Sequence, residues 1–459
     1  MRKSRNLKKV SPLGKVMLRN ILHTVLIVLF MLPIAMQGQQ FSIPYNVKYE
    51  KLNFELINNL IVIPLEVNGT QLSFVLDSGV STPILFNLTD QDSIQLRNVS
   101  EITINGLGDG EAISALSSTG NFFRLGSMKN PSQKLFVVMD ANINFSPSLG
   151  IPIHGIIGYD LFKDFIVDVN YGTKTIKFFD PESYVYKPHR KAQTLDISLV
   201  ARKAYLNASI DLKDNSELKV KMLLDTGSSD AIWLFEDERI KLPEKYYEDF
   251  LGKGLAGDIY GKRTKVNRIK IGTFDLEDAK AAFPDMLTFN AIKDLGNRNG
   301  SLGGEILKRF NIIFDYPNEK ITLRKNANFK KPFHYNISGI DLQHAGMRYV
   351  SERIASTNGV VYNEERTYGD VQIILQNATK ISLVPEIVVS AIRAGSPAHS
   401  AGLMEGDIIL AVNGKRIHRY KLQEVMQMLN DNQGKRVKVL VERYNRDLLF
   451  SFVLKDLFK

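Results

Sequence analysis

Two stretches of this 459-residue chain decide its fold: residues 60–79 read LIVIPLEVNGTQLSFVLDSG, and residues 205–227 read YLNASIDLKDNSELKVKMLLDTG. In each stretch apolar residues alternate with polar ones, a polar turn follows, and a second apolar run ends on an aspartate. Alternation with a period of two is typical of half-buried β-strands, and the polar turn favours a hairpin. The two stretches therefore predict equivalent β-hairpins that end on Asp77 and Asp225.

The similarity between the two halves continues downstream. In the same order along the chain, Gly126 matches Gly272, residues 156–158 match 301–303, residues 170–171 match 315–316, and the strand-like residues 175–178 match 320–323. A repeat of this kind predicts two similar lobes, residues 39–190 and residues 191–330, each rich in short strands with glycine turns. We therefore expect a mainly β fold built from two similar lobes.

The turn after each apolar strand carries the chemistry. Burying a carboxylate is costly unless it is hydrogen-bonded or shares a proton with a second one. We expect the hydroxyl after each aspartate and nearby N–H groups to bond the carboxylate, and the following glycine to allow close backbone approach. The predicted supporting residues are Ser78, Gly79, Thr226, Gly227 and Ser228. A single Asp-Ser-Gly is usually only a turn, but two at equivalent points favour a shared site.

These loops resemble those of the aspartic peptidases, of both the pepsin type and the retroviral type. In that family each loop is followed, many residues later, by two apolar residues and a glycine, as in residues 156–158 here. In residues 301–303 Ser301 departs from this pattern. The resemblance covers about residues 55–325 and implies a bilobal β-barrel fold in one chain. It also implies that Asp77 and Asp225 share one proton and activate a water molecule to hydrolyse a peptide bond.

Enzymes of this family close a hairpin over the substrate, so the resemblance also implies flaps. The flap candidates are Gly106, Gly108 and Gly110 in the first lobe and Gly257, at the end of residues 252–257, in the second. A mobile surface hairpin with no role in the site is an equally good interpretation of either segment.

The character of the sequence changes from about residue 333. The motifs GSPA (395–398), AGL (401–403), GDII (406–409) and VNG (412–414) resemble a bacterial PDZ domain over residues 333–459, which implies an α+β fold. PDZ domains bind extended peptides, often C-terminal ones, at a sheet edge. The resemblance implies a carboxylate-binding loop at Ser338, Gly339 and Ile340, with residues 345–380 as an insertion. A rigid cap on the peptidase is the alternative.

The amino terminus has the order of a secretory signal. Residues 1–38 hold seven Lys and Arg, no acidic residue and an apolar run from Ile21 to Met36, so we predict a signal peptide or an N-terminal anchor. Most of the net charge of +10 is placed there, which argues against nucleic-acid binding. The chain has no cysteine, which excludes thiol catalysis and disulfides.

The patterns together predict an exported bacterial aspartic endopeptidase of the periplasm, cell envelope or medium. Its predicted partners are a peptide or unfolded protein substrate and a C-terminal peptide at the PDZ domain. We expect no nucleic acid, no cofactor and no metal, and membrane contact only through residues 1–38. The alternative is a catalytically inactive peptide-binding scaffold that retains the fold.

Overall fold

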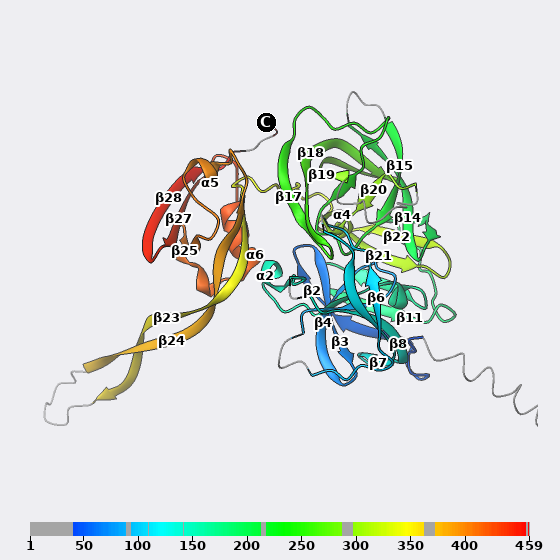
Figure 1. Ribbon diagram of the computed structural model, residues 1–459, viewed down its shortest axis with the longest axis horizontal. Helices are drawn as coiled ribbons and strands as arrows, with labels where there is room; N and C mark the ends of the chain where they lie inside the picture. The colour runs from blue at the N-terminus through cyan, green and yellow to red at the C-terminus, as the bar shows by residue number, and fades with distance from the viewer. Residues whose placement is uncertain are drawn as a thin grey trace, which may run out of the picture.

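A computed structural model describes residues 40–88, 93–108, 110–140, 142–212, 217–286, 297–361, 372–455 and 458 (Figure 1). The predicted signal peptide or anchor, residues 1–38, lies outside the described residues. Within those ranges, no helix combines the length and the apolar character needed to span a membrane. The fold is mainly β, as predicted.

The first half of the chain forms an eight-stranded sheet that curls on itself. Its strand order is β2 (Glu55–Ile57), β3 (Leu60–Val67), β4 (Thr70–Leu76), β9 (Gly155–Ile157), β5 (Ile84–Leu85), β8 (Met128–Val138), β7 (Ile113–Leu125) and β6 (Ser100–Ile104). A further pairing between β3 and β7 closes the sheet. Asn68 and Gly69, both with positive φ, make the predicted two-residue turn between β3 and β4.

The second half forms an eight-stranded sheet with the same connectivity. Its order is β13 (Ser198–Val200), β14 (Lys203–Asp211), β15 (Glu217–Leu224), β20 (Gly300–Leu302), β16 (Ile232–Leu234), β19 (Phe274–Pro284), β18 (Gly257–Ile271) and β17 (Tyr247–Gly254). The closing pair, β14 with β18, is the equivalent of β3 with β7. Every strand thus has a counterpart in the first sheet, which is the structural form of the repeat seen in the sequence.

A third sheet joins the two halves. Its order is β1 (Tyr49–Asn53), β11 (Thr175–Phe179), β10 (Ile166–Asn170), β21 (Phe310–Asp315), β22 (Lys320–Lys325) and β12 (Ala192–Asp196). Each half contributes three strands, and β10 and β21 pair antiparallel at the centre. One continuous apolar core runs through both halves; the ring of Phe162 stacks on that of Tyr316 at 5.2 Å between centroids. The two lobes therefore share one sheet and one apolar core and are not joined by a linker alone.

The C-terminal part is an α+β unit with its own apolar core. Its elements are β23 (Ile340–Val361), β24 (Gln372–Ile392), α5 (Pro397–Ser400), β25 (Ile408–Val412), β26 (Lys415–Arg416), the 3-10 turn Ile417–Arg419, α6 (Leu422–Leu429), β27 (Arg436–Arg443) and β28 (Arg446–Val453). The sheet order is β23-β24-β25-β27-β28, with β26 beside β25.

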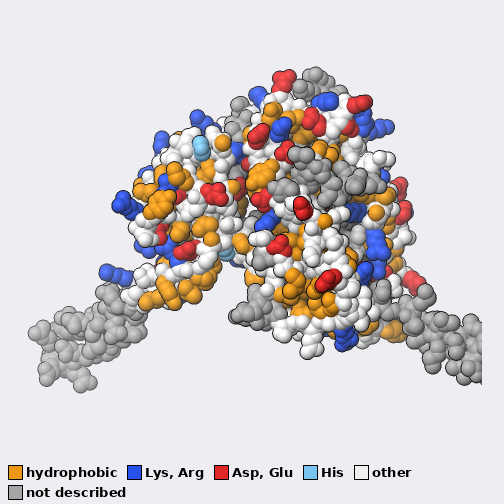
Figure 2. Space-filling view, viewed as in Figure 1, with side chains coloured by type: hydrophobic (Ala, Val, Ile, Leu, Met, Phe, Trp, Pro, Cys, Tyr) orange, Lys and Arg blue, Asp and Glu red, His pale blue; other side chains and the backbone are white. Residues whose placement is uncertain are grey.

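Residues 345–380, predicted as an insertion, belong largely to the outer part of the β23–β24 hairpin, which projects away from the unit (Figure 1). Apolar side chains are exposed where the hairpin leaves the domain (Figure 2). They are Met347, Tyr349, Ile381 and Leu383. The described part of the segment thus extends the paired strands β23 and β24, with shifts of register between residues 344 and 347 and between residues 357 and 360.

The C-terminal unit rests against both lobes (Figure 1). The Gln423 side chain at the start of α6 donates a 2.7 Å hydrogen bond to the Leu149 carbonyl in α2 (Ser146–Leu149) of the first lobe. On the second lobe, the ring of Phe458 packs 5.6 Å from that of Tyr247. Arg393 lies 3.9 Å from Asp249. These contacts hold α6 facing the space between the lobes.

Candidate active site

Each predicted catalytic aspartate stands at the end of a buried strand. The N–H of Asp77 follows β4 and donates a 2.8 Å hydrogen bond to the Ile157 carbonyl. The N–H of Asp225 follows β15 and donates at 3.0 Å to the Leu302 carbonyl. Because β9 and β20 run parallel to these strands at equivalent places, the two aspartates are positioned in the same way.

The two carboxylates approach a common point between the lobes. A β-carbon placed on Gly79 would lie 3.1 Å from Asp77 Oδ1 and 3.5 Å from Asp225 Oδ1. A single atom at that position would therefore contact both carboxylates. A β-carbon on Gly227 would collide with the carboxylate of Asp77, at 2.3 Å from Cγ. Glycine is needed at this place because the opposite aspartate occupies the space.

The hydroxyls of the two loops do not bond the carboxylates, contrary to our expectation. The Ser78 hydroxyl donates to the Leu224 carbonyl and the Thr226 hydroxyl to the Leu76 carbonyl, each at 2.7 Å. The N–H of Ser78 donates to Thr226 Oγ1 at 2.9 Å, and the N–H of Thr226 donates to Ser78 Oγ at 3.0 Å. This buried reciprocal set of hydrogen bonds fastens each loop to the other and so fixes the spacing of the aspartates.

The carboxylates are bonded by backbone N–H groups instead. Gly79 donates to Asp77 Oδ1 at 2.7 Å, and Gly227 donates to Asp225 Oδ1 at 3.1 Å. The N–H of Ser228 also lowers the pKa of Asp225, in line with the supporting role predicted for that residue. Such bonds favour the ionised form of a carboxyl group.

The electrostatic surroundings of the two aspartates differ and shift their pKa values by different causes. Burial and the nearby charge of Asp225 raise the pKa of Asp77 to about 7. Burial also raises the pKa of Asp225, but Arg298, the Gly227 N–H and Lys203 act in the opposite direction. The arrangement favours a pair that holds one proton, placed mainly on Asp77, with Asp225 ionised.

The predicted flap segments of the two lobes contact each other. The N–H of Gly110 donates to the Ala256 carbonyl at 2.7 Å, and the N–H of Ala256 donates to the Leu107 carbonyl at 2.9 Å. Gly106 packs on Leu255, while Gly108 packs on Ala256 and Gly257. Residues 105–107 and 252–255 line the same cavity as the aspartates, so the two segments together form its roof.

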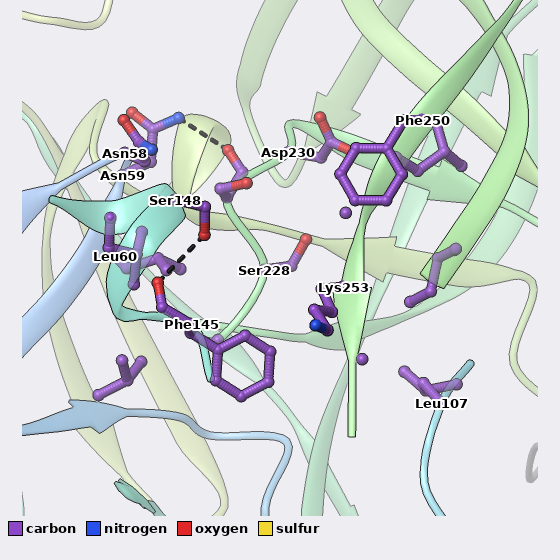
Figure 3. A pocket seen from close by; sticks show the side chains of 18 of the residues that line it. Asn58, Asn59, Leu60, Leu107, Phe145, Ser148, Ser228, Asp230, Phe250 and Lys253 are labelled. Carbon is purple, nitrogen blue, oxygen red and sulfur yellow. Dashed lines mark hydrogen bonds between the residues drawn. The ribbon is translucent and has the colours of Figure 1, made fainter. Parts of the chain in front are cut away.

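The cavity has a volume of about 1380 Å³ and receives side chains from both lobes and from the C-terminal unit. Figure 3 shows Leu60 and Phe145 of the first lobe on one side, and Asp230, Phe250 and Lys253 of the second lobe on the other. A volume of this size accommodates an extended peptide of several residues. No group of three or more His, Asp or Glu side chains placed to hold a metal ion occurs within the described ranges.

The basic residues that line the cavity were missed by the sequence analysis, among them Lys203 and Arg298 near the aspartates. Lys203 could have been noticed in the sequence, because the repeat aligns this charged residue with the apolar Leu60 at the start of the equivalent strand. Arg298 stands just before β20 in a segment without a clear counterpart, and only the folded chain brings it near Asp225.

An ion-pair network supports the second-lobe side of the cavity. Arg263 binds Asp230 at 2.7 Å and Asp249 at 2.6 Å, and all three side chains are largely buried. Asp230 also accepts a 2.7 Å hydrogen bond from the indole N–H of Trp233. Although burial opposes it, Arg263 and Lys280 keep the pKa of Asp230 below its usual value. The network therefore fixes the wall on which Trp233 lies.

The loop predicted to bind a peptide carboxylate does not offer free donors. The N–H of Ser338 donates to the Asn430 side chain, that of Gly339 to the Asn336 side chain, and that of Ile340 to the Ser338 hydroxyl. The loop is also buried. In this conformation it does not fit the predicted carboxylate-binding role, because its donors are already used.

The groove between β23 and α6 opens onto the cavity, and residues 149–150 at the end of α2 in the first lobe contact both elements. Strand β23 is an edge strand whose partner among the described residues is β24. Leu342 on β23, Gln423 and Met426 on α6, and Asn430 directly after α6 line the same cavity as the aspartates. An unpaired strand edge beside a helix is the arrangement to which a peptide adds as an extra strand.

Comparison with known proteins agrees with this architecture. Residues 63–161 match the sequence model of the family described as aspartyl protease, and residues 388–443 match that of the PDZ domain. The chain therefore combines an aspartyl-protease segment with a C-terminal PDZ domain, and it resembles the aspartic peptidases as predicted. The family match contains the loop of Asp77; the equivalence of Asp225 rests on the duplicated topology.

One relative is a probable periplasmic serine endoprotease, DegP-like, of Chlamydia trachomatis serovar D. It is 41% identical over 70 residues, which cover 15% of this chain and 13% of the relative. This chain thus spans a small part of that relative. Because the relative is named a serine endoprotease, the likeness does not bear on the aspartate chemistry.

Proposed function

We infer that the chain is an aspartic endopeptidase that hydrolyses peptide bonds in peptides or unfolded proteins. The observation that carries this proposal is the approach of two carboxylates, Asp77 and Asp225, to one point at the floor of a peptide-sized cavity. The reciprocal loop hydrogen bonds and the shared proton support it, because both are needed to keep two acidic groups together.

In this mechanism the ionised Asp225 removes a proton from a water molecule, and the water oxygen bonds to the carbonyl carbon of the substrate. Protonated Asp77 gives its proton to the carbonyl oxygen, so a neutral tetrahedral intermediate forms. Its breakdown cleaves the C–N bond, with one proton passing from Asp225 to the leaving nitrogen and one returning to Asp77. The products are a carboxyl group and an amine, and the pair again holds one proton.

The remaining features would serve substrate binding. The roof made by residues 105–107 and 252–255 excludes water from the reaction and must open to admit a chain. The PDZ domain binds or positions the peptide beside the cavity through the β23 edge and α6. An N-terminal signal or anchor in residues 1–38 would deliver the enzyme to the periplasm, the cell envelope or the medium.

Cleavage of a mixed peptide library, followed by mass spectrometry between pH 4 and pH 8, tests the proposal. We expect defined cut sites with the wild-type chain and none with Asp77→Asn or Asp225→Asn. Binding of the same peptides to both variants, with no cleavage by the wild type at any pH, would instead favour the inactive scaffold.

A further inference from the structure

The second-lobe wall of the cavity carries a basic residue beside Asp225. Tyr205 on β14 pairs with Leu223 on β15. Continuing this antiparallel register by two residues brings Lys203 opposite Asp225, on the same face of the strands as Tyr205. Lys203, Tyr205 and Leu223 all line the cavity.

Arg298 adds a second positive charge to this wall. Its guanidinium lies over the ring of Phe235, 5.2 Å from the centroid, and its side chain lines the cavity. Its Nε is buried and has no hydrogen-bond partner among the described residues. A buried guanidinium nitrogen without an acceptor is costly, so an anionic group bound in the cavity would be favoured at this place.

The local charges do not balance. The acidic groups that act on Lys203 are Asp77 and Asp225, and Asp225 is the carboxylate that acts on Arg298. A pair that shares one proton carries one negative charge, whereas Lys203 and Arg298 carry two positive charges. Among these described groups one positive charge is therefore left over in a partly dehydrated cavity, where a bound anion would stabilise it most.

The first lobe shows that an aspartate loop of this kind does not require such cations. In the first lobe Val62 pairs with Val75 as Tyr205 pairs with Leu223, so Leu60 is the counterpart of Lys203. Apart from Asp77, the first-lobe residues that line the cavity carry no charge, and they include Leu60, Val75, Ile84, Phe136 and Ile156. The basic pair is thus a property of one side of the cavity, and it lies on the side where one flank of the substrate would bind.

We propose that Lys203 and Arg298 form an anion subsite that binds a carboxylate of the peptide substrate on the second-lobe side of the scissile bond. The carboxylate belongs either to a Glu or Asp side chain or to the C-terminus of the peptide. The subsite rests on the proposed peptidase function and adds a substrate class to it: peptides that are uncharged on one flank of the cut and anionic on the other.

Matched peptides test the subsite. A cleaved parent peptide is prepared with Glu or Gln at each position flanking the cut, and with a free or an amidated C-terminus. We expect one carboxylate position to raise kcat/KM by about tenfold over its neutral partner, because charge-assisted bonds are worth that much. Loss of the preference on Glu→Gln identifies a side-chain carboxylate, and loss on amidation identifies the C-terminus.

Variants assign the effect to the two residues. Lys203→Met and Arg298→Leu should each reduce the preference, while Lys203→Arg and Arg298→Lys should retain part of it. Lys219→Met is the matched control, since Lys219 is an exposed lysine on the neighbouring strand β15. Equal rates for acidic and neutral peptides with the wild type, or an unchanged preference in both neutral variants, would overturn the proposal.

A binding measurement separates this proposal from the peptidase function. Fluorescence anisotropy with Asp77→Asn records the affinity for the same labelled peptides without cleavage. A tighter complex with the acidic peptide than with its Gln partner, abolished by adding Lys203→Met, supports the subsite even if no peptide is ever hydrolysed. Equal affinities for the two peptides would reject it, whether or not the wild type is an active peptidase.

Discussion

The two lobes share one topology but present different walls to the cavity. Each of the eight strands in the first sheet has a counterpart in the second, and both aspartate loops are bonded by the same backbone contacts. Apart from Asp77, the first wall carries no charged side chain, whereas the second carries Lys203 and Arg298. The comparison teaches that the backbone places the chemistry symmetrically, while the side chains of the walls make the site asymmetric.

The largest expected effect is the loss of activity when either aspartate is replaced. Asp77→Asn and Asp225→Asn should each lower kcat/KM by at least about a thousandfold, because each removes one proton-transfer group from the site. Initial rates on one defined peptide measure the loss. A variant that retained a tenth of the wild-type rate would show that the lobes do not contribute one catalytic group each.

Removal of the hydroxyls tests whether the loops hold each other equally. Ser78→Ala and Thr226→Val should each destabilise the fold by about 1–3 kcal/mol, because each leaves a carbonyl and an N–H buried without a partner. Denaturant unfolding gives the free energies. Ser81→Ala, whose hydroxyl makes a longer and exposed bond to Ala201, is the control and should be close to neutral.

The pH profile of kcat/KM should reveal the electrostatic difference between the aspartates. Activity should fall as pH rises through about 7, where Asp77 loses the shared proton. The acidic limb belongs to Asp225, whose pKa is raised by burial, a rise that Arg298 opposes. Arg298→Leu should therefore move the acidic limb to higher pH and leave the basic limb in place. A shift of the basic limb alone would reverse our assignment of the proton.

The pH dependence of stability also tests the assignment of the shared proton to Asp77. The pKa of Asp77 is raised from 3.8 to about 7 on folding, so its contribution is most favourable at low pH and is lost as pH rises through this window. Asp77→Asn should consequently raise the free energy of unfolding at pH 8 by roughly 1–3 kcal/mol relative to the wild type, and have little effect at pH 4. An equal change at both values would contradict it.

The smallest expected effect is on thermal stability, when Lys203 of the second wall is replaced by leucine, the residue that stands at the equivalent position of the first wall. Burial and the nearby Arg298 lower the pKa of Lys203, so its charge destabilises the folded state at pH values below both its folded and unfolded pKa. Lys203→Leu should raise Tm by a few degrees at pH 6. A lower Tm would indicate that the lysine is required for the fold rather than for a ligand.

Local sequence patterns were sufficient to predict much of the fold. The alternation around Val67 and Thr70 and the strand that ends at Asp225 predicted the hairpins, and the repeated order of landmarks predicted two equivalent lobes. Of the predicted flap glycines, Gly106 lines the cavity, and the contact of the two segments with each other was not foreseen. Periodicity and turn residues report on neighbours in sequence, which is why these features were accessible.

The missed features depend on contacts between distant residues. Nothing around Ser78 indicates that its hydroxyl bonds to Leu224, because that partner comes from the opposite loop. The same holds for Ser338, whose N–H is taken by Asn430. Arg298 becomes part of the site only when β20 inserts between β15 and β16. Such pairings require the tertiary arrangement, which no short window of sequence specifies.

The sheet shared by the lobes has a consequence for truncated forms of the chain. Cutting after residue 190 would leave the edge of β10 unpaired, with its N–H and C=O groups exposed. Since β21 is the counterpart of β10, a second copy of the first half could occupy its place antiparallel about a twofold axis. A half-length product would thus be inclined to self-associate, bringing two copies of Asp77 together at the new symmetry axis.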